Sequence, residues 1–270
     1  MTKGNPAVLE AFTKTPFTAL GRTREVYRLG SGPTVLILSE MPGITPSLVT
    51  FAKRVVAQGF SVAIPHLFGR DGNVANNGEF LKTFGEVCVS REFTLFATGK
   101  SSRVTKWLNE LARHEHQTNG GPGVGVIGMC LTGGFALAMM VDPVVVAPVL
   151  SQPSLPFPRK DHHKSDPGIS ATEMAKVKAR TENGVCIMAY RFTGDKLSPG
   201  QRFENLRNVL GDGFIGVEID STPGNEWGYP ADAHSVFTEG QDNKAGSPTT
   251  QAMDQLLNFF ATRLSASAQP

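Results

Sequence analysis

The chain has 270 residues, of which 40% are hydrophobic and 19% charged, and its formal net charge is +2 at pH 7. This length can bury a large core within a single domain, and the composition excludes an intrinsically disordered chain. Lys and Arg form no dense run, which makes nucleic acid a poor candidate partner.

The cysteine content indicates a reducing compartment. Cys88, Cys130 and Cys186 are odd in number and irregular in spacing, which argues against a disulfide framework. The first twelve residues contain no continuous apolar segment, so we expect no signal peptide. A cytoplasmic protein is the expectation from these two features.

The predicted elements alternate between strands and helices from residue 35 onward. A buried strand at 35–38 precedes a helix that Thr45-Pro46 opens and Gly59 closes. A strand at 60–64 follows, and Ser101 or Ser102 can cap the next helix. The remaining predicted strands are 123–127, 144–150, 185–190 and 214–219, and the remaining predicted helices begin after residue 130, Ser170, Ser198 and Ser247.

This alternation predicts an α/β protein with a mainly parallel sheet covered by helices on both faces. No internal repeat or dividing linker is present, so residues 1–270 are expected to form one domain. The segment 151–169 is expected to be a long surface loop or a lid. The stretch 120–141 carries no charge but contains seven glycines, and we interpret it as a buried strand, turn and helix rather than a membrane span.

The sharpest local signal is Gly128-Met129-Cys130-Leu131-Thr132-Gly133-Gly134, between a predicted strand and a predicted helix. Small neighbours allow a tight strand-to-helix turn there, and a helix N-terminus favours a thiolate over a thiol. The backbone N–H of Leu131 would face a developing oxyanion. The alternative is a glycine-rich packing turn in which Cys130 is a small buried hydrophobe.

Two later residues complete a candidate triad with Cys130. Asp195 follows the predicted strand 185–190, and His234 follows the last predicted strand by a loop. The order nucleophile, acid, histidine is that of α/β-hydrolases, whose catalytic groups gather at the carboxyl ends of strands. The rival acids are Asp220, Glu218 and Asp232, and a solvated surface role is the alternative for each loop residue.

At this point the sequence resembles the dienelactone hydrolase family over roughly residues 35–260. The resemblance rests on segments 39–43, 64–69 and 128–134, on Gly194-Asp195 and on Ala233-His234-Ser235. It implies a three-layer α/β-hydrolase fold and a triad formed by Cys130, His234 and Asp195. It also implies that Glu40 lies near the thiol and hydrogen-bonds it at rest, and that the N–H groups of Leu131 and Met41 form the oxyanion hole.

The chain departs from the family pattern at three positions. Thr132 stands where the family usually has Gly, His66 where it usually has Asp, and Thr238 where dienelactone-cleaving members have an arginine. A neutral hydroxyl at Thr238 anchors a carboxylate less strongly than a guanidinium, so we expect neutral esters and lactones to be preferred. Arg91 is the remaining candidate for binding an anionic substrate, with a surface ion pair as its alternative.

The sequence therefore predicts a hydrolase that cleaves small esters or lactones through an acyl-thioester at Cys130, without cofactor, metal or membrane. The alternatives are a non-catalytic protein that binds a small acyl ligand in the same pocket, and a thioesterase or peptidase. The pairs His114/His116 and His162/His163 lack further metal-ligand types beside them and are interpreted as surface residues.

Overall fold

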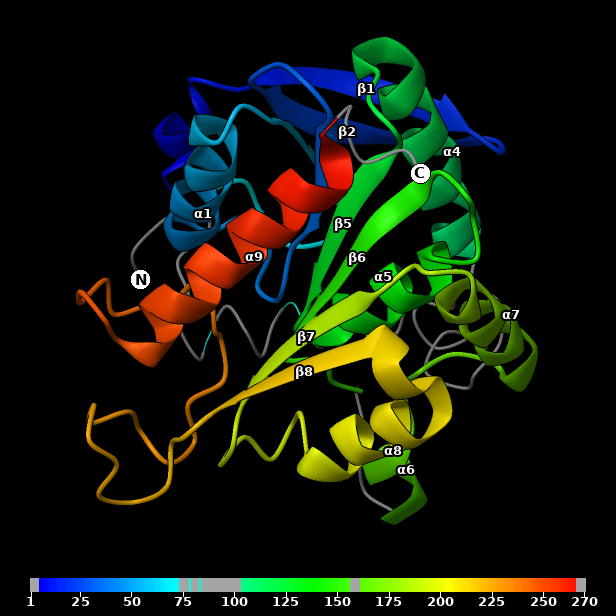
Figure 1. Ribbon diagram of the computed structural model, residues 1–270. Coiled ribbons are helices and arrows are strands. Elements are labelled where there is room, and N and C mark those ends of the chain that lie inside the picture. Colours follow the sequence, from blue (N-terminus) through cyan, green and yellow to red (C-terminus); the bar gives the residue numbers. More distant parts are fainter. Residues whose placement is uncertain (1–4, 73–77, 79–82, 84–102, 156–160, 266–270) are drawn as a thin grey trace.

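The computed structural model describes residues 5–72, 78, 83, 103–155 and 161–265 (Figure 1). Among these residues, eight strands form one sheet. They are β1 (Thr13–Ala19), β2 (Arg22–Leu29), β3 (Thr34–Leu38), β4 (Ser61–Pro65), β5 (Val124–Met129), β6 (Val145–Ser151), β7 (Ile187–Phe192) and β8 (Phe214–Ile219).

The strands lie in the order β1-β2-β4-β3-β5-β6-β7-β8. The hairpin β1–β2 is antiparallel and joins β4 in an antiparallel sense, whereas every pair from β4 to β8 is parallel. The carboxyl ends of β3, β5, β6, β7 and β8 therefore point to one edge of the sheet. The candidate site residues follow these ends.

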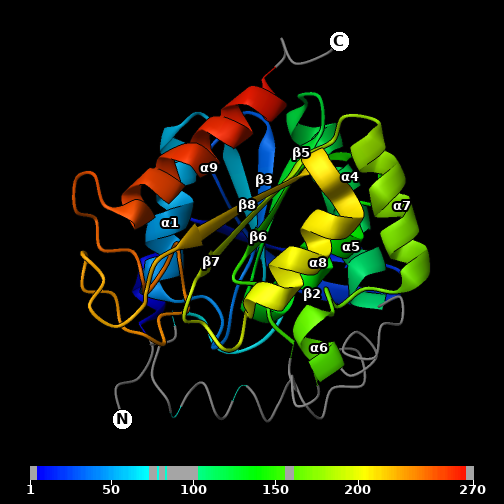
Figure 2. The ribbon, with the colours of Figure 1, turned by 60° about the horizontal axis from the view of Figure 1, so that its bottom comes forward.

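Helices cover both faces of the sheet (Figures 1 and 2). On one face lie α1 (Pro46–Ala57) and α9 (Pro248–Leu264), and on the other lie α4 (Arg103–Asn119), α5 (Gly133–Met139), α7 (Ala171–Glu182) and α8 (Gly200–Leu210). The short helix α6 (Asp161–Ser165) packs beside α8. The 3-10 turns are η1 (Pro6–Leu9), η2 (Cys130–Thr132) and η3 (Gly211–Gly213).

Two apolar clusters fill the space between the layers. Phe51 of α1 and Phe260 of α9 belong to the first, together with alternate side chains of the strands. Trp107 of α4, Phe135 of α5 and Phe203 of α8 belong to the second. This arrangement confirms the predicted three-layer α/β-hydrolase architecture with a mainly parallel central sheet.

Sequence signals located the helix starts well. Thr45, Ser170 and Ser247 each accept a hydrogen bond from a backbone N–H of the first helical turn, and Ser170 forms the predicted capping box with Glu173. The start at Ser198-Pro199 was less accurate, because α8 begins at Gly200 without a side-chain cap. The predicted cap at Ser101 or Ser102 lies outside the described residues.

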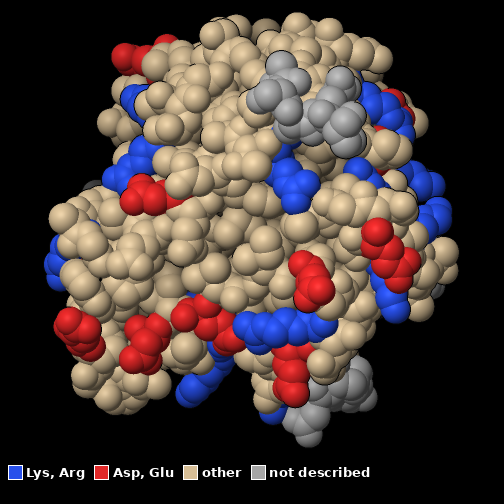
Figure 3. All heavy atoms as spheres, viewed as in Figure 1, with Lys and Arg blue, Asp and Glu red and all other residues tan. Residues whose placement is uncertain are grey.

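The uncharged stretch 120–141 forms β5, η2 and α5, and all seven residues of α5 are buried. Its apolar character thus comes from burial between the sheet and the helices α4 and α7. No helix in the part of the chain that the structure describes has the length and hydropathy needed to cross a bilayer. The face in Figure 3 carries both signs of charge interspersed.

Candidate active site

Cys130 occupies a sharp turn between β5 and α5. Its φ is +54°, a left-handed conformation that is costly for a residue with a side chain. The turn closes tightly because a side-chain carbon at Gly128 would clash with the Thr132 carbonyl, and one at Gly133 would clash with Pro153. The glycines on both sides of Cys130 are therefore required by close approach of the backbone.

Thr132 fixes this turn to the neighbouring strand. Its hydroxyl oxygen accepts a 2.8 Å hydrogen bond from the Met129 N–H and lies 2.8 Å from the Leu38 carbonyl at the end of β3, to which it donates. The side chain is fully buried. A threonine in place of the usual glycine thus adds a cross-link between β3 and the turn.

Cys130 is 3% exposed, and its thiol contacts a serine. Its Sγ lies 2.9 Å from Oγ of Ser154, and the Ser154 N–H donates a 3.0 Å bond to the Cys130 carbonyl. Ser154 follows β6 and was not singled out from the sequence, because an isolated serine in a Pro-rich segment carries no motif.

Glu40 lies at the end of β3 and is buried, but its hydrogen bonds differ from those expected. Its carboxylate accepts bonds from Ser235 at 2.7 Å, from Gln152 at 3.0 Å and from the Thr238 hydroxyl. In the described residues the thiol interacts with Ser154 and His234, and no hydrogen bond joins it to Glu40. Three donors already satisfy the carboxylate, so the expected hydrogen bond from the thiol is not formed.

His234 and Asp195 lie together, although 39 positions separate them in the chain. Nδ1 of His234 is 2.7 Å from Oδ2 of Asp195, whose other oxygen accepts a 2.9 Å bond from the Leu197 N–H. Gly194 permits this arrangement, because a side chain there would clash with the Ala231 carbonyl.

The rival carboxylates have other partners. Glu218 forms ion pairs with Arg191 and Arg207, and Asp220 accepts bonds from Thr222. Asp232 is exposed on the loop before His234. Of the four acids considered, the structure places Asp195 against the imidazole.

The electrostatic setting of His234 favours its protonated form. Burial opposes the charge, but the Cys130 thiolate and the hydrogen bond to Asp195 outweigh it and raise the pKa of His234 well above its usual value. Nε2 of the ring is buried and has no oxygen or nitrogen partner among the described residues. This nitrogen is available to a thiol or to a substrate atom.

The two residues expected to form the oxyanion hole lie next to other candidate site residues. Leu131 follows Cys130 as the second residue of η2, where the N–H groups lack partners within the turn, and Met41 follows Glu40. Other residues singled out from the sequence lie away from the triad or are not placed. Arg91 and Cys88 lie outside the described residues. Cys186 is a half-buried free thiol, and Nε2 of His66 lies 3.4 Å from Oδ1 of Asp71. The described residues contain no group of three His, Cys, Asp or Glu side chains placed to hold a metal.

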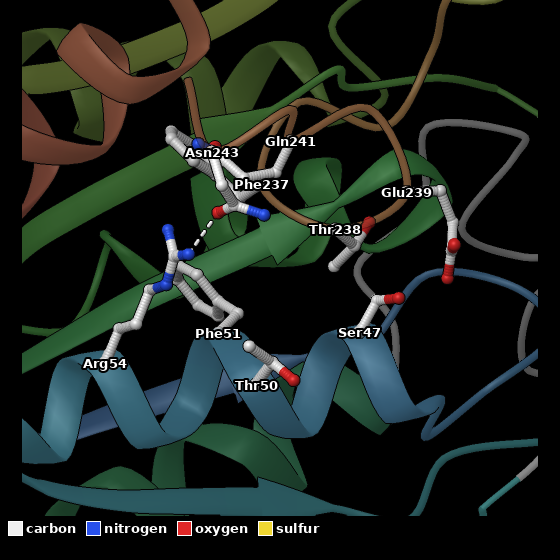
Figure 4. A pocket seen from close by; sticks show the side chains of 9 residues that line it. All are labelled: Ser47, Thr50, Phe51, Arg54, Phe237, Thr238, Glu239, Gln241 and Asn243. Carbon is white, nitrogen blue, oxygen red and sulfur yellow. Dashed lines mark hydrogen bonds between the residues drawn. The ribbon is translucent and has the colours of Figure 1, made fainter. Parts of the chain in front are cut away.

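Two hollows lie near this centre. One, of about 490 Å³, is lined by the loop 227–244 and includes His234 and Trp227. The other, of about 280 Å³, lies between α1 and residues 237–243, with Arg54 bonded to Asn243 at one end (Figure 4). Thr238 lines the second hollow, and its hydroxyl donates to Glu40.

The sheet order and the turn at the end of β5 define a protein of the α/β-hydrolase class. The model of the dienelactone hydrolase family matches residues 24–264, and the chain belongs to this family of hydrolases. A search of curated proteins finds no match.

Solved structures share the fold at low sequence identity. A dienelactone hydrolase-like promiscuous phosphotriesterase from metagenomic libraries has a TM-score of 0.63 at 14% identity, covering 94% of this chain and 98% of that one. A cold-adapted esterase from an Arctic intertidal metagenomic library has a TM-score of 0.59 at 12% identity, covering 95% and 96%. The thioesterase domain from the curacin biosynthetic pathway has a TM-score of 0.57 at 11% identity, covering 92% and 100%.

Proposed function

We propose that this protein hydrolyses small carboxylic esters or lactones by covalent catalysis at Cys130. The observation that carries the proposal is the 2.7 Å contact between Nδ1 of His234 and Asp195, which leaves Nε2 of the same ring to act on Cys130. A nucleophile, a base and a residue that orients the base are the parts that acyl transfer requires.

In the proposed reaction the thiolate of Cys130 attacks the ester carbonyl, and the N–H groups of Leu131 and Met41 bind the resulting oxyanion. Imidazolium His234 then donates its proton to the leaving alkoxide, which leaves an acyl-thioester. His234 next takes a proton from water, the hydroxide attacks the thioester, and the carboxylic acid departs as the thiolate reforms. Asp195 holds the Nδ1–H tautomer throughout.

The surroundings of Thr238 support a preference for uncharged substrates. Its hydroxyl donates to Glu40 and is therefore not free to bind a substrate carboxylate. The buried carboxylate of Glu40 also repels an anion at this position. Neutral esters and lactones are thus the proposed substrates, and a loss of one charged hydrogen bond corresponds to about tenfold weaker preference for an acid.

The test is a panel of aryl esters, lactones and thioesters assayed with wild type, Cys130→Ala and the control Cys186→Ala. We expect Cys130→Ala to lose about three orders of magnitude or more in kcat/KM, and Cys186→Ala to retain wild-type rates. Mass spectrometry should detect an acyl adduct on the peptide that contains Cys130.

Other outcomes distinguish the alternatives. Activity of Cys130→Ala within tenfold of wild type would refute the assignment of the nucleophile. Ligand binding without turnover by the wild type would favour a non-catalytic acyl-binding protein. A preference for thioesters over oxygen esters would favour a thioesterase, and comparison of a lactone acid with its methyl ester tests the charge preference.

A further inference from the structure

The described residues include a buried arginine next to the site that none of the steps above uses. Arg202 lies in the first turns of α8 and is 1% exposed. Its guanidinium donates to the carbonyls of Asp166 at 2.6 Å, His163 at 3.0 Å and Leu197 at 3.3 Å, and also to the carbonyl of Pro153. These acceptors come from three segments of the chain, at residues 153, 163–166 and 197.

All four acceptors are neutral backbone oxygens, and no ion pair of Arg202 occurs among the described residues. Burial lowers the pKa of Arg202 to about 10, whereas the charges of Asp166, Asp195 and Cys130 raise it, so the side chain remains a cation at neutral pH. An unpaired buried charge is costly, and neutral donors would satisfy the same carbonyls at a smaller cost. The positive charge of Arg202 is therefore not explained by its hydrogen bonds to carbonyls alone.

The position of the guanidinium connects it with the two halves of the site. Pro153 directly precedes Ser154, whose hydroxyl contacts the thiol. Leu197 donates its N–H to the carboxylate of Asp195. Arg202 therefore holds the segment that carries the partner of the thiol and the segment that carries the partner of His234 in one arrangement.

We propose that Arg202 is a positioning residue whose buried positive charge stabilises the thiolate of Cys130. This proposal rests on the proposed function in one respect, that the thiolate of Cys130 is the nucleophile. The guanidinium binds the carbonyl of Pro153, and the hydroxyl of the next residue, Ser154, contacts the thiol, so a buried cation lies close enough to favour a negative charge on Sγ of Cys130. Asp195 adds a negative charge to the same buried surroundings, and Arg202 and His234 are the cations that it interacts with.

Other charged groups near α8 are already paired or lie on its outer side. Arg191 of β7 binds the carbonyls of Ser198 and Thr193, so it supports the same Asp195 segment, but Glu218 neutralises its charge. The further titratable groups lie on α8 itself and on the elements packed against it: Glu204 and Arg207 on α8, Asp161, His162, His163 and Lys164 on α6, Glu173, Lys176, Lys178, Arg180 and Glu182 on α7, Asp212 on η3 and Glu218 on β8.

The experiment measures the rate of alkylation of Cys130 by iodoacetamide between pH 5 and pH 10, read by mass spectrometry on the peptide that contains Cys130. The variants are Arg202→Gln, Arg202→Lys and the matched control Arg191→Gln, which removes a second buried guanidinium that binds carbonyls on either side of Asp195. We expect Arg202→Gln to move the midpoint of the pH profile upward by about one unit. Arg202→Lys and Arg191→Gln should keep the midpoint of the wild type.

An unchanged midpoint in Arg202→Gln would overturn the proposal, and so would equal shifts in Arg202→Gln and Arg202→Lys, which would point to hydrogen-bond geometry instead of charge. If Arg202→Gln does not fold, Arg202→Lys still decides, because a shifted midpoint in that variant contradicts a role for the charge. Failure of both variants to fold would reduce Arg202 to a folding residue. Alkylation needs no substrate, so failure of the proposed ester hydrolysis leaves this test intact.

Discussion

Two residues at the site adopt backbone conformations that favour glycine. Cys130 has a φ of +54°, and Gln152, at the end of β6, has a φ of +35°. Gln152 donates to Glu40 and accepts a 3.2 Å bond from the Val236 N–H, two positions after His234. Strain of this kind persists only where the surroundings fix the backbone. Here it aims the Cys130 thiol and joins the β6 end to the loop that carries His234.

The protonation of His234 leads to a prediction for the pH dependence of stability. Its pKa in the folded state is raised above the ordinary value of 6.5 by the Cys130 thiolate and Asp195, against the effect of burial. The protein therefore gains stability from this group that is fully present below about pH 6.5 and is lost as the pH rises through the folded-state pKa. We expect the difference in unfolding free energy between wild type and His234→Gln to shrink with rising pH.

Urea denaturation at a series of pH values measures this difference. Cys130→Ser is the control, because it removes the thiolate while keeping the Asp195 contact, and its pH dependence should be weaker than that of wild type. A difference that does not vary with pH would show that His234 titrates alike in both states.

The site residues that sequence analysis located are those whose chemistry is tied to a local pattern. Cys130 stands in a glycine-rich turn, and Asp195 and His234 follow strand ends in the expected order. Ser154, Gln152 and Arg202 were missed because their roles depend on tertiary contacts. A buried arginine that binds only carbonyls has the same local sequence as a surface arginine on a helix. The place of Glu40 in the site was predicted from the sequence, but the donors that bind its carboxylate were not.

At the scale of elements, Thr132 links β3, β5 and α5, and this gives a second prediction. Thr132→Val keeps the volume but leaves the Met129 N–H and the Leu38 carbonyl without their buried partner. Each unsatisfied group costs about 1–3 kcal/mol. Chemical denaturation should therefore show a loss of stability of this order or more, with lower activity.

Thr249→Val is a suitable comparison, since Thr249 is also fully buried and hydrogen-bonded but lies in α9. It should lose stability without a direct effect on the turn at Cys130. Equal activity losses in the two variants would mean that Thr132 acts only through global stability.

The hairpin β1–β2 shows where sequence patterns failed for the elements. Its two-residue turn is Leu20-Gly21, with φ values of +52° and +71°. Turns of this type usually carry Asn or Asp at the first position, and an exposed leucine gives no such signal. The strands themselves are largely polar because only one side of each contacts the core. The buried parallel strands were predicted because both of their faces are apolar.

At the scale of the whole molecule, the sheet joins all parts of the chain. Its strand order interleaves early and late segments, with β3 next to β5 and the hairpin joined to β4. The two apolar clusters pack on opposite faces of the same strands. Loss of either helix layer would expose one face of the sheet, so the layers are expected to depend on each other for stability. This supports the expectation of a single folding unit.

The two tryptophans of the chain provide a test of that cooperativity. Trp107 is buried in α4, packs edge-on against Phe17 at 5.4 Å and donates to the Arg22 carbonyl, so it reports on the hairpin side of the molecule. Trp227 is half-buried in the loop before His234 and packs against the cluster on the other face. In Trp107→Phe the remaining fluorescent reporter is Trp227, and in Trp227→Phe it is Trp107. For each variant we expect the midpoint of urea unfolding measured by tryptophan fluorescence to equal the midpoint measured by circular dichroism. An earlier transition of Trp227 alone would instead show that the loop carrying His234 unfolds before the sheet, and that the site is less stable than the fold that supports it.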